Sequence, residues 1–231
     1  MPRISAVIPL YNEEDNVVPL QQQLESGLSG FDYEIIFVDD GSRDATADRI
    51  QRKSGVRVLQ FEKNTGQSAA MYAGIMAAAG EIIVLLDGDL QNDPADIAKL
   101  VAEIDKGADL VCGYRAKRRD TVVKRITSRV ANFVRSRFIG DGVRDTGCSL
   151  KALRTETRDA LFLFYGMHRF IPALIKSAGY KLVEIPVNHR HRVAGISKYG
   201  LGNRAFKATA DMFGVAWLIS RRVNYKIKPE A

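Results

Sequence analysis

The sequence predicts an α/β fold with a mainly parallel central sheet and helices on both faces. Three observations support this prediction. In the first half, short β-branched apolar runs alternate with longer segments of helical spacing, the pattern of strands that are joined by covering helices. Of the 231 residues, 46% are hydrophobic, which is enough to bury one substantial core. No repeat, low-complexity tract or Pro/Ser-rich linker divides the chain.

Five strands and four helices are predicted in the first half. The strands are the apolar runs at residues 4–8, 34–38, 56–61, 82–86 and 109–112. The segments between them predict helices at residues 14–26, 44–53, 67–79 and 95–105. Pro94 stands where a first helical turn tolerates proline, and Gly80 stands where a helix should stop.

The second half is more basic. Residues 121–138 predict a basic amphipathic helix, and a Gly/Asp-rich loop follows at residues 140–147. A strand around 149–153, a helical region at 155–178, a strand at 181–187 and a helix at 203–220 complete the pattern. We expect residues 1–200 to form the main domain. Residues 201–231 would be an amphipathic helix and basic tail, which either belongs to that domain or anchors it to a membrane surface.

Charge and cysteine content restrict the partners and the compartment. The net charge of +7 suits phosphate-bearing partners but selects none of them. Cys112 and Cys148 form no CxxC motif, which favours reduced thiols in a cytoplasmic protein. The first apolar stretch is too short for a signal peptide. The apolar runs also fall below the roughly 20 residues that a membrane span needs, so we expect any membrane contact to be peripheral.

Acidic clusters follow three of the predicted strands, at the ends where ligands bind in open α/β sheets. The clusters are PLYNEE at residues 9–14, VDDGSRD at 38–44 and LDGDLQ at 86–91. Each alone is also what a polar turn looks like. Asp87, Asp89 and Gln91 together supply the oxygen ligands that Mg²⁺ or Mn²⁺ prefers. Since the chain has no P-loop, a divalent cation would have to help hold any diphosphate.

Seven motifs together resemble family-2 glycosyltransferases, and most closely their polyprenyl-phosphate branch, which includes undecaprenyl-phosphate sugar transferases and dolichyl-phosphate mannose synthases. The motifs are VIPLYNEE (7–14), VDDGSRD (38–44), NTGQSAA (64–70), LDGDLQ (86–91), DTGC (145–148), HRF (168–170) and RVAGISKY (192–199). The likeness covers residues 4 to 200. Many members of the family carry transmembrane helices after the catalytic domain, whereas none is predicted in this chain.

The resemblance implies a fold of the GT-A type that binds a nucleotide-sugar, which we expect to be a UDP-sugar. It also implies roles for the residues that match the family's motifs. Asp87, Asp89 and Gln91 would hold Mg²⁺ or Mn²⁺. The base, ribose and diphosphate of the donor would be bound by Pro9, Tyr11, Glu13, Asp40, Ser42, Gly66, Gln67, Asp87, Arg192, Ser197 and Lys198.

The expected acceptor is a polyprenyl phosphate, which is ionised near neutral pH because a phosphate monoester has a second pKa of about 6. We assign its phosphate to Arg115, Arg125 and Ser128, since an arginine fork pairs with two phosphate oxygens. Asp89, Asp145 and Arg115 are the candidate catalytic residues. The reaction would invert the anomeric centre in one displacement. The enzyme would sit on the inner face of the cytoplasmic membrane, against anionic lipid, and a homo-oligomer remains open.

Other functions explain less of the sequence. A soluble glycosyltransferase acting on a sugar hydroxyl of a glycolipid or polysaccharide is the main alternative, but it would need an effective general base. A nucleotidyltransferase would be expected to carry a Gly-rich basic loop near its N-terminus, which residues 4–14 do not contain. Nucleic acid is not an expected partner, because the acidic clusters would repel a phosphate backbone.

Overall fold

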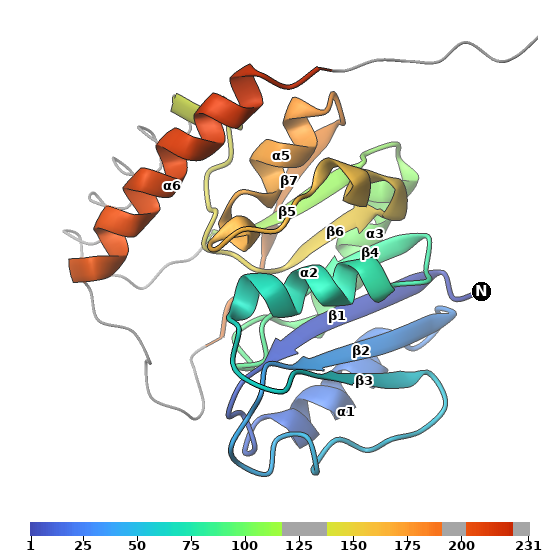
Figure 1. Ribbon diagram of the computed structural model, residues 1–231. Coiled ribbons are helices and arrows are strands. Elements are labelled where there is room, and N and C mark those ends of the chain that lie inside the picture. The colour runs from blue at the N-terminus through green and yellow to red at the C-terminus, as the bar shows by residue number, and fades with distance from the viewer. Residues whose placement is uncertain (117–137, 191–201, 224–231) are drawn as a thin grey trace, which may run out of the picture.

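The computed structural model of the protein describes residues 1–116, 138–190 and 202–223, with the backbone alone for residues 202–209. Seven strands in this part of the chain form one sheet in the order β3-β2-β1-β4-β6-β5-β7 (Figure 1). The strands are β1 (Ile4–Leu10), β2 (Tyr33–Asp39), β3 (Val56–Gln60), β4 (Ile82–Leu85), β5 (Leu110–Arg115), β6 (Lys151–Arg154) and β7 (Leu182–Val187).

The pairing confirms the predicted mainly parallel sheet. Strands β1 to β4 pair in parallel, and β5 pairs in parallel with β7. Only β6 among these strands runs antiparallel to its neighbours, β4 and β5. Its first residue, Lys151, therefore lies opposite Leu85 and Cys112, toward the carboxyl ends of β4 and β5.

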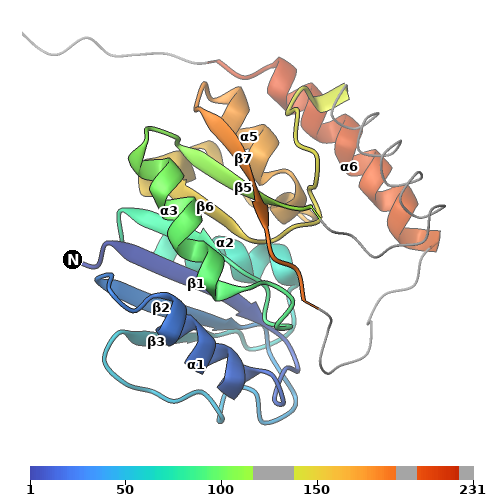
Figure 2. The same ribbon diagram turned by 180° about the vertical axis from the view of Figure 1, so that it is seen from behind.

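Helices cover both faces of the sheet, as predicted. The helices α2 (Gln67–Ala77) and α5 (Ile171–Ser177) cover the face seen in Figure 1. The other face carries α1 (Val17–Gly27) and α3 (Ile97–Asp105), the latter preceded by the short 3₁₀ helix η1 (Pro94–Asp96) (Figure 2).

Two apolar clusters form the core, one on each face. In β1, Ile4, Ala6 and Ile8 join the cluster with α1 and α3, while Val7 joins the cluster with α2 and α5. This alternation follows from the two-residue period of a strand. Helix α2 approaches the sheet closely, because a Cβ on Gly74 would lie 2.3 Å from Cγ1 of Val7.

The helix predicted at residues 44–53 is wrong. The segment forms turns, with one helical hydrogen bond from the amide of Arg49 to the carbonyl of Ala45. Asp44 binds the amide and hydroxyl of Thr46, and the amide of Gln51 donates to the side chain of Gln21. Side-chain acceptors thus replace helical backbone partners. Ile50 is the only large apolar residue of the segment, so no apolar stripe favours a helix.

The helical region predicted at residues 155–178 is also corrected, since it is broken rather than continuous. It contains the 3₁₀ helices η2 (Thr155–Ala160) and η3 (Met167–Arg169) before α5 begins. Gly166 has a φ of 90°, a left-handed conformation that interrupts a helix. Of the helix predicted at residues 121–138, all but the last residue lies outside the described residues.

The predicted C-terminal helix forms as α6 (Gly202–Ser220). Its residues Met212, Val215 and Ile219 pack on the same apolar cluster as α2 and α5. Figure 1 shows α6 beside α5, at the end of the molecule remote from β3. None of the helices in the described part of the chain is long and apolar enough to span a bilayer.

Candidate active site

The loops that follow β1 and β2 lie against each other, because Leu10 and Asp39 are in register at the ends of these strands. The amide of Asn12 donates to Oγ of Ser42 at 2.9 Å, and the amide of Glu13 donates to Oγ1 of Thr46 at 2.8 Å. The predicted nucleotide-binding residues Tyr11, Glu13 and Ser42 are therefore brought together at the carboxyl edge, next to Pro9 in β1.

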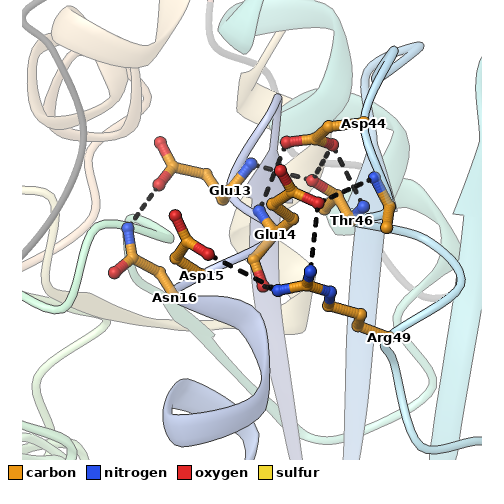
Figure 3. A network of polar contacts seen from close by, with 8 residues as sticks. Glu13, Glu14, Asp15, Asn16, Asp44, Thr46 and Arg49 are labelled. Atoms are coloured by element: carbon orange, nitrogen blue, oxygen red, sulfur yellow. Dashed lines mark hydrogen bonds and ion pairs between the residues drawn. The ribbon is translucent and has the colours of Figure 1, made fainter.

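Glu13 and Glu14 face different surroundings (Figure 3). The carboxylate of Glu13 accepts a hydrogen bond of 2.6 Å from the side chain of Asn16. Glu14 pairs with Arg49 at 3.3 Å in a partly exposed network that includes Asp44. Exposed pairs of this kind contribute about 0–1 kcal/mol each, so the network shapes the two loops without adding much stability.

Asp40 is buried and holds the loop that leads into α2. Its two carboxylate oxygens accept hydrogen bonds from the amides of Thr65 and Gly66, at 2.7 and 2.8 Å, and from the side chain of Asn64 at 2.8 Å. Burial, with a contribution from Asp39, raises the pKa of Asp40 despite these hydrogen bonds. Asp40 therefore holds Gly66 and Gln67, two of the predicted nucleotide-binding residues, beside the ends of β1 and β2.

Asp87 follows β4 and connects the start of α2 with the segment that precedes β6. Nε2 of Gln67 donates to Oδ1 of Asp87 at 2.7 Å, and the hydroxyl of Ser149 also bonds to this carboxylate. Burial and the negative charge of Asp89 raise the pKa of Asp87 above its ordinary value. The two carboxylates thus repel each other in a site where positive charge would be stabilising.

The backbone around Asp87 and Asp89 is tightly placed. A Cβ on Gly88 would lie 2.6 Å from Cδ2 of Leu10 and 3.3 Å from the carbonyl oxygen of Pro9. This loop therefore packs directly on the end of β1. Leu90 has a φ of 61°, a conformation that non-glycine residues rarely adopt, and the amide of Gln91 donates to Asp89 at 3.2 Å.

Arg115 and Asp145, both predicted to be catalytic, form an ion pair at the end of β5. Asp145 is buried, and its carboxylate receives both Nε and Nη2 of Arg115. The segment from Asp145 onward then reaches Asp87, since the side chain of Asn92 donates to Oγ of Ser149 at 2.6 Å and Ser149 bonds to Asp87. Residues 145–149 thus connect the predicted acceptor-binding Arg115 with the predicted metal ligand Asp87.

Two residues beside Asp87, and a third at the start of α2, were not assigned a role from the sequence. Ser149 bonds to Asp87, and Lys151 is a buried cation whose Nζ donates to the carbonyl of Cys148 and whose charge acts on Asp87. Ser68 accepts a hydrogen bond from the amide of Gly166 and pairs with Nδ1 of His168 at 2.8 Å. A lysine inside a predicted strand was the one available signal for Lys151.

Five predicted site residues lie outside the described residues: Arg125, Ser128, Arg192, Ser197 and Lys198. The other predicted residues fall in two neighbouring groups at the carboxyl edge. One group surrounds Asp87, and the other is the pair of Arg115 and Asp145.

The donor atoms at Asp87 fit a hard divalent cation. Two carboxylates come together on one loop, and burial and the charge of Asp89 destabilise the negative charge of Asp87. Mg²⁺ and Mn²⁺ sites of this kind use one or two carboxylates and complete their shell with substrate phosphates. Within the described ranges, no group of three or more His, Cys, Asp or Glu side chains converges as a metal site.

Fold and site together define a GT-A-type glycosyltransferase. A seven-stranded, mostly parallel sheet carries acidic groups after β1, β2 and β4, and a basic–acidic pair lies after β5. Residues 5–162 match the model of glycosyl transferase family 2, and the chain belongs to this family.

Similar sequences include enzymes of polyprenyl-phosphate glycosylation. The chain is 37% identical over 237 residues to dodecaprenyl-phosphate galacturonate synthase of Rhizobium johnstonii, covering 98% of this chain and 69% of that protein. It is 40% identical over 203 residues to undecaprenyl-phosphate 4-deoxy-4-formamido-L-arabinose transferase of Pseudomonas fluorescens, covering 85% of this chain and 60% of that protein. The chain thus spans about three fifths to two thirds of the length of these relatives.

Solved structures support the fold. A crystal structure of glucosyl-3-phosphoglycerate synthase from Mycobacterium tuberculosis in complex with phosphoglyceric acid has a TM-score of 0.72 at 22% identity, covering 94% of this chain and 80% of that one. The same enzyme in complex with Mg²⁺ and UDP has a TM-score of 0.71 at 23% identity, covering 93% and 80%. At these identities the likeness concerns the fold alone.

Proposed function

We propose that this chain transfers a sugar from a UDP-sugar to a polyprenyl phosphate, with inversion at the anomeric carbon and dependence on a divalent cation. The observation that carries the proposal is the placement of Asp87 and Asp89 between the predicted nucleotide loops and the pair of Arg115 and Asp145. The printed functions of the similar sequences support the polyprenyl-phosphate acceptor.

On the donor side, hydrogen bonds connect the residues of the proposed nucleotide site. Asp40 holds the turn at Gly66, and Gln67 connects that turn to Asp87. Such an arrangement supports binding of a nucleoside diphosphate across the ends of β1, β2 and β4, at the edge where open α/β sheets bind ligands. Because these contacts exist before the donor arrives, little ordering of the turn at Gly66 is needed on binding.

Asp87, Asp89 and Gln91 would hold Mg²⁺ or Mn²⁺, and the bound cation would supply positive charge for the leaving diphosphate. The cation would add to the positive charge of Lys151 and offset the repulsion between the carboxylates of Asp87 and Asp89. Their repulsion in the structure described above favours cation binding at this loop.

On the acceptor side, Arg115 would orient the lipid phosphate. One phosphate oxygen attacks the anomeric carbon, and the bond from that carbon to the diphosphate oxygen breaks, so the electron pair leaves with the nucleoside diphosphate. Because the phosphate is already ionised, no proton has to be removed from the nucleophile. Asp145 would orient Arg115 through its two hydrogen bonds of 2.7 and 2.8 Å.

In the decisive experiment, the full chain is incubated with undecaprenyl phosphate, MnCl₂ and a panel of radiolabelled UDP-sugars. The panel contains glucose, galactose, glucuronic acid and aminoarabinose donors. Label should enter an organic-soluble product with one of the donors. Asp89→Asn should abolish this transfer. Asp105→Asn should not, because Asp105 is exposed and pairs with Arg3 at the start of β1.

Two results would contradict the proposal. Full turnover in excess chelator would exclude the role of the divalent cation. Label that enters a glycolipid or polysaccharide acceptor, but never undecaprenyl phosphate, would favour the alternative glycosyltransferase that acts on a sugar hydroxyl.

The outer face of α6 supports binding to an anionic membrane from the cytoplasmic side. Phe213, Trp217 and Leu218 are 54%, 61% and 40% exposed, and the ring of Phe213 packs edge-on against Phe138 at 4.9 Å. Arg222, which lies in the predicted basic tail, donates to the carbonyls of Ala160 and Leu174 and so faces the protein. We therefore place α6 within the catalytic domain and assign only its outer face to lipid.

A deletion of residues 203–231 would be a poor test of lipid binding, because it would remove Met212 and Val215 from their packing on the apolar cluster of α2 and α5. A sharper test is the double substitution of Phe213 and Trp217 by serine. The variant should lose co-sedimentation with vesicles rich in phosphatidylglycerol and should remain folded by circular dichroism, because both side chains are more than half exposed. Unchanged co-sedimentation would exclude this face as the lipid contact.

A further inference from the structure

The chain that follows β7 lies against the loop that carries Asp89 and Gln91. His189 forms an antiparallel bridge with Asn92, and the amide of Arg190 donates to the carbonyl of Gln91 at 2.8 Å. Figure 2 shows the end of β7 running down beside the loop that precedes α3. Segments far apart in the sequence thus meet at the predicted cation site.

The side chain of Arg190 strengthens this contact. Nη2 of Arg190 lies 2.6 Å from Oδ1 of Asp93, and Nη1 donates to Oε1 of Gln23 in α1 at 2.5 Å. Asp93 also accepts a hydrogen bond of 3.1 Å from the amide of Ala95, at the start of η1. Burial acts to raise the pKa of Asp93, but the hydrogen bonds from Ala95 and Arg190 outweigh it. The pKa is therefore lowered, as expected for a carboxylate paired with a cation.

A second carboxylate, that of Asp96, also binds the segment that follows β7. Asp96 is 1% exposed, and its Oδ2 accepts a hydrogen bond of 2.6 Å from the amide of Asn188. Its Oδ1 lies 2.5 Å from Nζ of Lys99. Residues 188–190 are therefore bound to both Asp93 and Asp96, which directly follow the loop that carries Asp87, Asp89 and Gln91 (the cation loop).

The loop needs such support because Leu90 is held in a left-handed conformation. Its φ is 61°, and a conformation of this kind costs about 1–2 kcal/mol for a residue with a Cβ. Strained residues of this kind persist only where the surrounding structure fixes them. The side chain of Leu90 is buried in the core, and Arg190 fixes the backbone immediately after it. If the loop were released, relaxation at Leu90 would reorient Asp89 and Gln91.

We propose that Arg190 is a positioning residue of the divalent-cation site. Its side chain, through Asp93, holds residues 188–190 in place, so that its main-chain amide keeps the Gln91 carbonyl, and with it Asp89 and Gln91, in position. Arg190 does so from the protein side and contributes no ligand. The inference depends on the proposed cation role of Asp87 and Asp89. Groups that orient metal ligands from behind typically change metal affinity about 10- to 100-fold when they are substituted.

The test is a titration of the full chain with Mn²⁺ in the presence of UDP, followed by the electron paramagnetic resonance signal of free Mn²⁺. Arg190→Ala and Asp93→Asn should each weaken Mn²⁺ binding about tenfold. The double variant should lose little more than either single variant, because both remove the same contact. Arg190→Lys should give an intermediate Kd, because it keeps the charge without the fork that reaches both Asp93 and Gln23.

The pair of Arg3 and Asp105 provides a matched control. Its N–O distance is also 2.6 Å, but it joins the start of β1 to the end of α3, away from the cation loop. Arg3→Ala should leave the Mn²⁺ affinity unchanged. If Arg190→Ala lowers Tm but not Mn²⁺ affinity, its role is only structural and the inference is overturned. If the unsubstituted chain binds no Mn²⁺, the proposed cation role fails, and the inference with it.

Discussion

Arg115 and Asp145 form a two-pronged ion pair, in which Nε lies 2.7 Å from Oδ2 and Nη2 lies 2.8 Å from Oδ1. The backbone amide of Arg115 donates to the same Oδ2 at 3.2 Å. The side chains are only 18% and 7% exposed. Removing one member of a buried pair of this kind takes a charged hydrogen-bond partner away from the other, which is more costly than the pair itself is stabilising.

Arg115→Ala should therefore lower the free energy of unfolding by about 3 kcal/mol, because the carboxylate of Asp145 stays buried. Urea denaturation measures this change. Arg3→Ala breaks an exposed pair and should cost under about 1 kcal/mol. Equal losses in the two variants would show that Asp145 is solvated rather than buried when Arg115 is absent.

Asp87→Asn should stabilise the chain in the absence of divalent cations. Burial and Asp89 raise the pKa of Asp87, so its ionised form is unfavourable in the folded state, and a neutral amide of the same shape removes that cost. A gain of roughly 1 kcal/mol would raise Tm by about 2–4 °C at neutral pH for a domain of this size.

The pH dependence of this gain has a definite sign. A carboxyl group with a raised folded-state pKa lowers stability as pH rises through the ordinary Asp pKa of about 3.9. Below that pH, Asp87 is protonated in both states, so the two proteins should melt alike. A Tm difference that persisted at acidic pH would contradict an electrostatic origin.

Cys112 should resist alkylation in the folded protein. Burial raises the pKa of its thiol to about 12, so almost none of the reactive thiolate is present at pH 8. Iodoacetamide followed by mass spectrometry should find Cys112 modified in urea but not in buffer. Since the unfolded thiol ionises near pH 8.5, stability should also fall as pH rises from there toward 12. Rapid native labelling at Cys112 would show local opening of the central sheet.

Ser68 and His168 should be energetically coupled. Oγ of Ser68 lies 2.8 Å from Nδ1 of His168 and accepts the amide of Gly166 at 3.0 Å, which joins the start of α2 to the chain before α5. Ser68→Ala leaves that amide and His168 without this partner and should cost about 1–2 kcal/mol. In a double-mutant cycle with His168→Ala, the coupling should exceed about 0.5 kcal/mol. Additive losses would show that the two residues do not depend on each other.

Much of the site was predictable because it is local in sequence. The acidic groups at Asp40, Asp87 and Asp89 directly follow buried strands, and parallel strands end at one edge of a sheet. Hydrophobic periodicity locates those strands, so it also locates the carboxylates. The same reasoning failed at residues 44–53, because the amide of Gln51 there donates to the side chain of Gln21, a tertiary neighbour that local spacing does not indicate.

The sequence by itself therefore determined the α/β fold, the family and the positions of the acidic clusters, since these depend on short patterns of apolar and polar residues. Only the tertiary structure decided that Asp145 faces Arg115, that Lys151 lies buried beside Asp87, and that Arg190 holds Asp93. These contacts join residues far apart in the chain, and they depend on strand order and on the antiparallel direction of β6. No local spacing encodes strand order, which is set when the whole sheet packs between its helices.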